Sequence, residues 1–166
     1  MGKVIWLNEM GEENMRRVIS NIDTVSDYFL SIESMTPKKL QKMCYYAYSW
    51  YLTLYDDFLF DDGKFQAWVH GPVNPRLYDK YKMYGWRDIP TRKEPALDED
   101  LSEFLDVIFN TFGEFSGNQL ERMTHNETPW IEARAGLEPE VASTNIIDDN
   151  TIKNFYTILM KNGQVE

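Results

Sequence analysis

Apolar residues recur along most of the chain at the three- and four-residue spacing of an amphipathic helix. The clearest example begins at Thr36-Pro37, a capping residue followed by proline at the first helical position, and continues to Leu54. Its apolar stripe is wide and lasts for several turns, so this segment is predicted to be a central core helix.

Further helices are predicted wherever a capping residue precedes an apolar stripe. Asn74-Pro75 and Thr128-Pro129 again place proline at the first helical position, and Ser116 with Gln119 fits a capping box. The predicted helices other than the central one begin after Asp23, Asn74, Asp98, Ser116, Thr128 and Asp149.

One region has the pattern of a sheet. Two short β-prone runs, residues 58–60 and 65–69, flank an Asp-Gly turn at Asp62-Gly63, which is typical of a hairpin. The following Gly71-Pro72-Val73-Asn74-Pro75 is predicted to be a rigid connector, because a residue before proline is driven toward extended geometry. The expected fold is mainly α, a single compact domain of about seven helices with one small β-hairpin around residues 58–69.

Length and composition are those of one globular domain: 166 residues, 43% hydrophobic and 27% charged. No apolar run approaches the ~20 residues of a membrane helix, so no membrane partner is expected. The start of the chain lacks the apolar core of a signal peptide, and a single cysteine, Cys44, suits a reducing compartment. A cytoplasmic location is therefore expected.

The net charge of −10 is unevenly distributed. Residues 1–95 carry 13 basic and 13 acidic side chains, whereas residues 96–166 carry 4 basic and 14 acidic ones. This acidic part would repel a phosphate backbone, so no direct nucleic acid binding is expected. It would attract a basic protein, although an acidic surface that keeps the protein in solution explains the charge equally well.

The chain has few of the residues that carry catalysis. It contains neither phosphate-binding glycine motif, and one cysteine with two histidines cannot form a zinc finger, so no cofactor and no metal are expected. His125 and nearby carboxylates leave a hydrolase or metal site as a minor alternative. Trp68, which precedes the rigid connector, and Trp130, which follows Pro129, fit either a recognition surface or a packed core.

Three blocks of sequence resemble the Panacea domain family, also called the SocA-like antitoxin domain. They appear in the family's order and extend over roughly residues 23–160. The first is a helix from Met35-Thr36-Pro37 to Tyr51-Leu52, and the closing Ile146-Ile147-Asp148 is similar to the family's end. The other blocks are Leu59-Phe60 with Phe65-Gln66-Ala67-Trp68-Val69-His70-Gly71-Pro72-Val73, and Leu120 with Thr124-His125 and Pro129-Trp130.

The resemblance implies a protein that neutralises a cognate toxin by direct binding, the toxin being encoded by an adjacent gene in bacteria or prophages. The implied division is an extension at residues 1–22, a Panacea-like domain at residues 23–161 and a short tail at residues 162–166. No catalytic residues follow from it, and the protein is not expected to be an enzyme. An alternative is a phage- or mobile-element-encoded adaptor without a cognate toxin.

The residues of the matching motifs are the candidates for partner binding. We expect them to converge near one face, next to the hairpin and the Thr128-Pro129 turn. The candidates are Trp68, His70, Gly71, Pro72, Asn74, His125 and Trp130.

Overall fold

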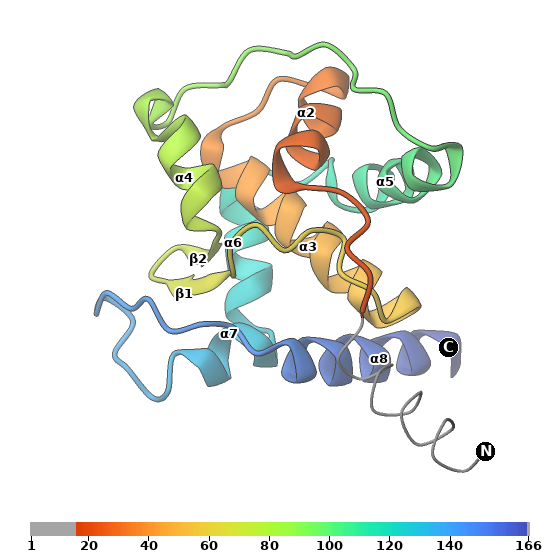
Figure 1. Ribbon diagram of the computed structural model, residues 1–166. Helices are drawn as coiled ribbons and strands as arrows, with labels where there is room; N and C mark the ends of the chain where they lie inside the picture. Colours follow the sequence, from red (N-terminus) through yellow and green to blue (C-terminus); the bar gives the residue numbers. More distant parts are fainter. Residues whose placement is uncertain (1–15, 166) are drawn as a thin grey trace, which may run out of the picture.

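The computed structural model describes residues 16–165, and its centre is the helix α3 (Pro37–Tyr55). Figure 1 shows α3 crossing the middle of the molecule, with α8 along the bottom and α2 and α5 above it. The other elements are α2 (Ile22–Ile32), β1 (Gln66–Trp68), β2 (Gly71–Val73), α4 (Pro75–Tyr81), the 3-10 helix η1 (Lys82–Tyr84), α5 (Glu99–Phe112), α6 (Gly117–His125), α7 (Thr128–Ala133) and α8 (Asp149–Val165). The described chain is thus mainly α with one small sheet, as the sequence predicts.

The central helix is enclosed around its whole circumference over its first half. Every side chain from Lys39 to Ser49 is buried, including the polar ones, because α2, α5, α6 and α8 all pack against α3. Aromatic rings fill much of the space between the helices. Tyr46, for example, stacks on Phe112 of α5 with ring centroids 4.2 Å apart.

Three predicted helix starts are confirmed at atomic detail. The Thr36 hydroxyl accepts a hydrogen bond from the backbone N–H of Lys39 at 3.2 Å, as an N-cap does. The Asn74 side chain accepts from the backbone N–H groups of Arg76 and Leu77, and Ser116 forms the full capping box. These caps depend on neighbouring residues alone, so local sequence identifies them.

Three predicted caps are wrong by one or two residues. Asn21 rather than Asp23 caps α2, Glu127 rather than Thr128 is the N-cap of α7, and Asp148 rather than Asp149 binds the backbone N–H of Thr151 at the start of α8. Tertiary contacts occupy Asp23 and Asp149. The carboxylate of Asp23 binds side chains of α4, and that of Asp149 accepts a hydrogen bond from the Tyr48 hydroxyl at 2.7 Å.

The sheet is a hairpin, but it lies further along the chain than the predicted residues 58–69. β1 and β2 pair antiparallel, with Gln66 opposite Val73 and Trp68 opposite Gly71, so Val69 and His70 form the turn. The Asp62-Gly63 turn joins no pair of strands. The predicted connector at Gly71–Pro75 supplies β2 instead.

Backbone hydrogen bonds explain this difference. The segment around Phe58 binds the chain before α2: the N–H of Phe58 donates to the carbonyl of Arg17, and that of Ser20 donates to Leu59. Proline is accepted in β2 because Pro72 lies opposite Ala67, whose N–H donates outward to the carbonyl of Asn145. Pro72 therefore leaves no ladder bond unmade.

The proposed division at residues 22 and 161 stays a prediction. Residues 1–15 lie outside the described chain, and with them most of the predicted extension. Residues 16–20 contain no helix and run beside the Phe58 segment, and α8 continues to Val165 through most of the predicted tail.

Candidate partner-binding site

The β-hairpin forms one corner of the molecule, beside α4, α6 and α7 (Figure 1). Gly71 begins β2 with φ at +108°, a conformation that side chains disfavour. A Cβ built on Gly71 would lie 2.5 Å from Cε of Lys42, which is itself buried. Glycine at this position therefore lets the hairpin lie directly on α3.

Asn74 joins the hairpin to the central helix. It is fully buried, and the Gln41 side chain of α3 binds both its backbone groups: Asn74 N–H donates to Oε1 at 2.9 Å, and Nε2 donates to Asn74 O at 3.0 Å. The side chain of Asn74 meanwhile caps α4. Asn74 thus acts as a structural junction inside the fold.

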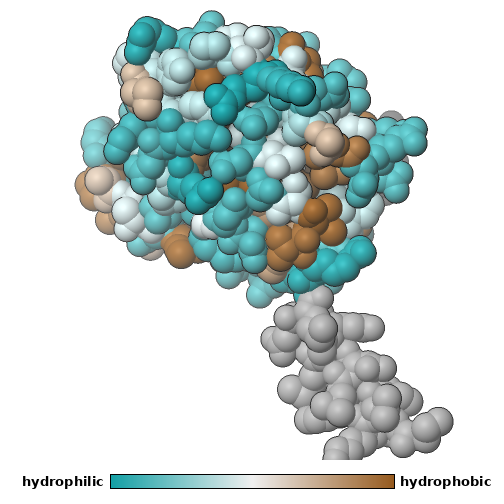
Figure 2. All heavy atoms as spheres, turned by 45° about the horizontal axis from the view of Figure 1, so that its top comes forward, coloured by the Kyte–Doolittle hydropathy of each residue, from teal (hydrophilic) through white to brown (hydrophobic). Residues whose placement is uncertain are grey.

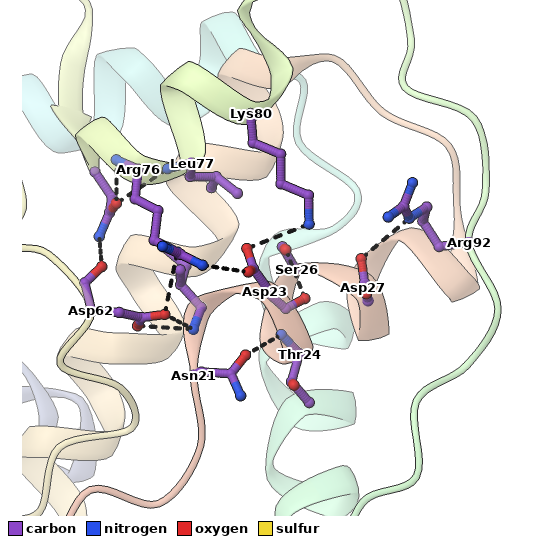
Figure 3. A network of polar contacts seen from close by, with 12 residues as sticks. Asn21, Asp23, Thr24, Ser26, Asp27, Asp62, Arg76, Leu77, Lys80 and Arg92 are labelled. Atoms are coloured by element: carbon purple, nitrogen blue, oxygen red, sulfur yellow. Dashed lines mark hydrogen bonds and ion pairs between the residues drawn. The ribbon is translucent and has the colours of Figure 1, made fainter.

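A polar network fixes α4 against the start of α2 (Figure 3). Arg76 and Lys80 of α4 both bind the carboxylate of Asp23, at 3.0 and 3.4 Å. The carboxylate of Asp62 accepts hydrogen bonds from the backbone N–H of Ile22. Asn74 and α4 are therefore held from two sides, by α3 and by this network.

Lys42 lies beneath the hairpin and was not singled out from the sequence. Its side chain is 1% exposed, and its ammonium donates a hydrogen bond to the carbonyl of Pro72 at 3.2 Å. Burial lowers the pKa of Lys42 to about 7, although the charge of Glu121 opposes this shift. A lysine outside the apolar stripe of a helix is normally exposed to water, but the hairpin packs on α3 and buries this one.

The two tryptophan motifs meet at the opposite side of the hairpin. Nε1 of Trp130 donates to the carbonyl of Trp68 at 2.9 Å, and the ring of Trp130 stacks on His125 with centroids 4.0 Å apart. Trp130 is only 8% exposed. Burial lowers the pKa of His125, so a neutral imidazole is favoured in this stack.

His70 is the most exposed of the candidates, at the tip of the hairpin. Its Nδ1 lies 3.3 Å from the carboxylate of Glu121, whose oxygen is 2.7 Å from Nζ of Lys38. Burial raises the pKa of Glu121, but hydrogen bonds from Lys38 and His70 outweigh this and lower it. His70 therefore lies at the edge of a charged group that joins α3 to α6.

A pocket of about 300 Å³ opens between α3, the hairpin and α4. Trp68 and His70 line one side of it, and Tyr78 meets the Trp68 ring edge-on at 4.8 Å. Trp86 forms part of the rim and is 75% exposed. The size and aromatic walls of this pocket suit a side chain or small group from another molecule.

All seven candidate residues thus lie around the hairpin, but they do not form one exposed face. Gly71, Pro72, Asn74 and Trp130 are buried. Trp68 and His125 are half-buried, and His70 alone is exposed. The surface of this corner includes Tyr78 and Trp86, which the sequence motifs did not single out.

The minor alternative of a metal or hydrolase site centres on His125, which is half-buried beside Trp130. In residues 16–165, no three His, Cys, Asp or Glu side chains are grouped so that they could hold a metal ion. Nε2 of His125 is buried and has no hydrogen-bond partner among the described residues. One face of the His125 ring is covered by the Trp130 ring.

Comparison with known proteins gives a family. The model of the family described as "Antitoxin SocA-like, Panacea domain" matches residues 40–131, which is more than half of the chain and includes all seven candidates. The chain belongs to this family. It is similar to Antitoxin SocA of Caulobacter vibrioides, with 30% identity over 135 residues that cover 69% of this chain and 68% of the relative.

The match places this member of the SocA-like antitoxin family among antitoxin-like proteins, as the motifs imply. The matched region runs from the first turn of α3 to the middle of α7, so it contains the hairpin and most of the residues that line the pocket. No solved structure matches the chain. None of the helices in the described part is both long enough and apolar enough to cross a membrane.

Proposed function

We propose that this Panacea-domain protein neutralises a cognate toxin by binding it directly, and that an adjacent gene encodes the toxin. The observation that carries this proposal is the family membership, together with the relative that is itself named an antitoxin. The family supports a role that is not enzymatic. A cytoplasmic location is part of this proposal, since Cys44 is the single cysteine of the sequence and can form no internal disulfide.

We further propose that the hairpin corner contacts the toxin through the half-buried and exposed candidates. Trp68 and His70 border the pocket, and the exposed ring of Trp86 extends its wall. Gly71, Pro72, Asn74 and Trp130 then support this surface from beneath, because they hold the hairpin on α3 and α7. His125 contributes by its stacking on Trp130.

Growth of a bacterial host expressing the adjacent open reading frame, alone and with this protein, tests the function. Arrest by the neighbouring product and rescue on co-expression are expected, with a stable complex after purification. Absence of arrest would contradict the proposal and would favour an adaptor that acts without a toxin.

The contact surface is tested by the Trp86→Ala variant, since this ring is exposed and its removal leaves the core intact. We expect weaker binding of the toxin and an unchanged melting temperature. Ile158→Ala, which removes an exposed apolar side chain from α8, is the matched control and should bind as the wild type does. Equal binding by both variants would exclude the pocket as a contact.

A further inference from the structure

A second concave surface lies between the last turns of α3 and the helix α5. It is an open groove of about 1100 Å³, separate from the hairpin pocket. Its apolar floor includes Trp50, Tyr51, Leu101, Phe104 and Ile108.

The walls of the groove expose large apolar side chains. Val107 of α5 is 61% exposed, and Leu54 and Tyr55 of α3 are 47% and 55% exposed. On each helix these residues follow helical spacing, Tyr51 with Leu54 and Tyr55, and Phe104 with Val107. Two such helical walls form the kind of groove into which a third amphipathic helix packs its apolar face.

The rim of the groove is acidic. Asp98, Glu99, Asp100 and Glu103 line it, all exposed, and none takes part in an ion pair with another described residue. The one cation among the lining residues is Arg17, whose guanidinium binds the carboxylate of Asp57 at 2.8 Å. The rim therefore presents a surplus of negative charge beside an apolar floor.

We propose that this groove binds a basic amphipathic helix of the toxin. The apolar face of that helix would cover the floor, and its lysine or arginine side chains would reach the four carboxylates. Figure 2 shows hydrophobic patches within a largely hydrophilic face, some on the right, the side on which Figure 1 shows α5. The assignment of the helix to the toxin rests on the proposed function, whereas the chemistry of the groove does not.

Charge complementarity favours a basic helix over residues 1–15 of the same chain as the occupant of the groove. Residues 1–15 contain the apolar run Val4-Ile5-Trp6-Leu7, but they carry three glutamates and one lysine. Seated in the groove, they would place like charges against the acidic rim, which is unfavourable. A second copy of the chain, with its net charge of −10, would meet the same repulsion.

A synthetic helical peptide tests the groove without the toxin. The probe is about three heptads long, with leucine at the core positions and lysine elsewhere, and its control carries glutamate in place of lysine. Fluorescence anisotropy with the full chain should show binding of the basic peptide only. Because any acidic protein attracts such a peptide, the variants decide whether it binds in the groove.

Two matched pairs of variants distinguish binding in the groove from nonspecific electrostatic attraction of the peptide to the acidic protein. Val107→Glu should weaken binding about tenfold or more, because it buries a carboxylate beneath the peptide, whereas Ile158→Glu on α8 adds the same charge and should leave binding unchanged. The triple variant Glu99→Gln, Asp100→Asn, Glu103→Gln should also weaken it. Its control, Asp88→Asn, Glu138→Gln, Glu140→Gln, changes the net charge equally at exposed sites outside the groove.

The groove inference is overturned if each variant binds the peptide as its control does, with all melting temperatures unchanged. It is also overturned if deletion of residues 1–15 strengthens binding about tenfold, which would make that segment the occupant. A dimer in sedimentation that Val107→Glu dissociates would make the occupant a second copy.

The same variants separate this inference from the proposed function. If the wild type rescues growth and Val107→Glu rescues equally, with equal peptide binding, the groove inference fails alone. If the neighbouring product causes no arrest while the peptide pattern holds, the proposed function fails and the groove remains a site for basic helices.

Discussion

Lys42 shows how strongly the fold determines the behaviour of one residue. Its ammonium is removed from water beneath the hairpin, and the carbonyl of Pro72 is its hydrogen-bond acceptor among the described groups. A charge in such surroundings is unfavourable, which lowers the pKa of Lys42 from 10.5 to about 7. Near neutral pH, folded molecules with charged and with neutral Lys42 are therefore both present.

This shift predicts a pH dependence of stability. Between about pH 7 and 10.5 the unfolded chain keeps the Lys42 proton while the folded chain has lost it, so stability rises with pH, by up to about 1.4 kcal/mol per unit. Lys42→Met, which keeps the length of the side chain, removes this contribution. Urea unfolding from pH 6 to 9 should show the wild type gaining stability relative to the variant, and parallel profiles would contradict the prediction.

The close approach of Gly71 to Lys42 predicts that a side chain at position 71 destabilises the fold. In Gly71→Ala the new methyl group meets the Lys42 side chain, and the positive φ adds backbone strain, so we expect a loss of about 2–4 kcal/mol in the free energy of unfolding. Gly136→Ala is the control, since its φ is also positive but open space surrounds it. Chemical denaturation should show the smaller loss for Gly136→Ala. Equal losses would mean that the close contact with Lys42 contributes nothing.

At the scale of elements, Glu127 joins three helices. It precedes α7, and its carboxylate accepts hydrogen bonds from the hydroxyls of Tyr46 on α3 and Tyr156 on α8, each at 2.8 Å. Burial raises the pKa of Glu127 to about 7, and the two hydroxyls oppose this shift without cancelling it. The protonation state of the carboxyl group that joins α7 to α3 and α8 therefore changes near neutral pH.

The raised pKa predicts that Glu127 stabilises the fold more at low pH. Its contribution is complete below about pH 4.5, where the folded and the unfolded state are both protonated, and is lost as the pH rises through about 7. In Glu127→Gln the amide cannot titrate but keeps an acceptor oxygen. The stability of the wild type relative to this variant should fall between pH 5 and 8 in denaturant titrations. A constant difference would contradict the raised pKa.

The elements that the sequence predicts best are those whose signals are local. Thr36-Pro37 and the capping box at Ser116 place two helix starts correctly, because each cap binds a backbone group three residues away. The hairpin depends on distant residues instead. The N–H of Ala67 binds Asn145, and Phe58 is paired with the chain before α2, so no turn motif could reveal the register.

The same distinction applies to the candidate site. The motifs selected Trp68 and Trp130, and the hydrogen bond between them confirms that they meet. Which of the seven residues reach the surface depends on how the hairpin lies on α3. The sequence predicts one apolar stripe on α3, but every side chain from Lys39 to Ser49 is buried. Lys42 was missed for that reason, since a lysine is normally expected at the surface.

At the scale of the whole molecule, the uneven charge predicts how the protein meets its partner. The surplus of ten negative charges lies within residues 96–166 and should speed the approach of a basic toxin. Raising the salt from about 50 to 500 mM should slow association about tenfold and change dissociation little. Stopped-flow or biosensor kinetics with the purified toxin measure both rates. An association rate that is independent of salt would show that the acidic part does not face the partner.

The position of the last helix has a consequence for synthesis on the ribosome. The hydroxyls of Tyr45 and Tyr156 lie 3.4 Å apart, and Lys153 binds Asp56 at the end of α3, so the central helix is covered by a helix that is made after all the other described elements. The hairpin also needs a later residue, because the N–H of Ala67 donates to the carbonyl of Asn145. A nascent chain therefore cannot complete its core until α8 has left the exit tunnel. A surface that depends on the completed core is consequently acquired only after α8 has been made.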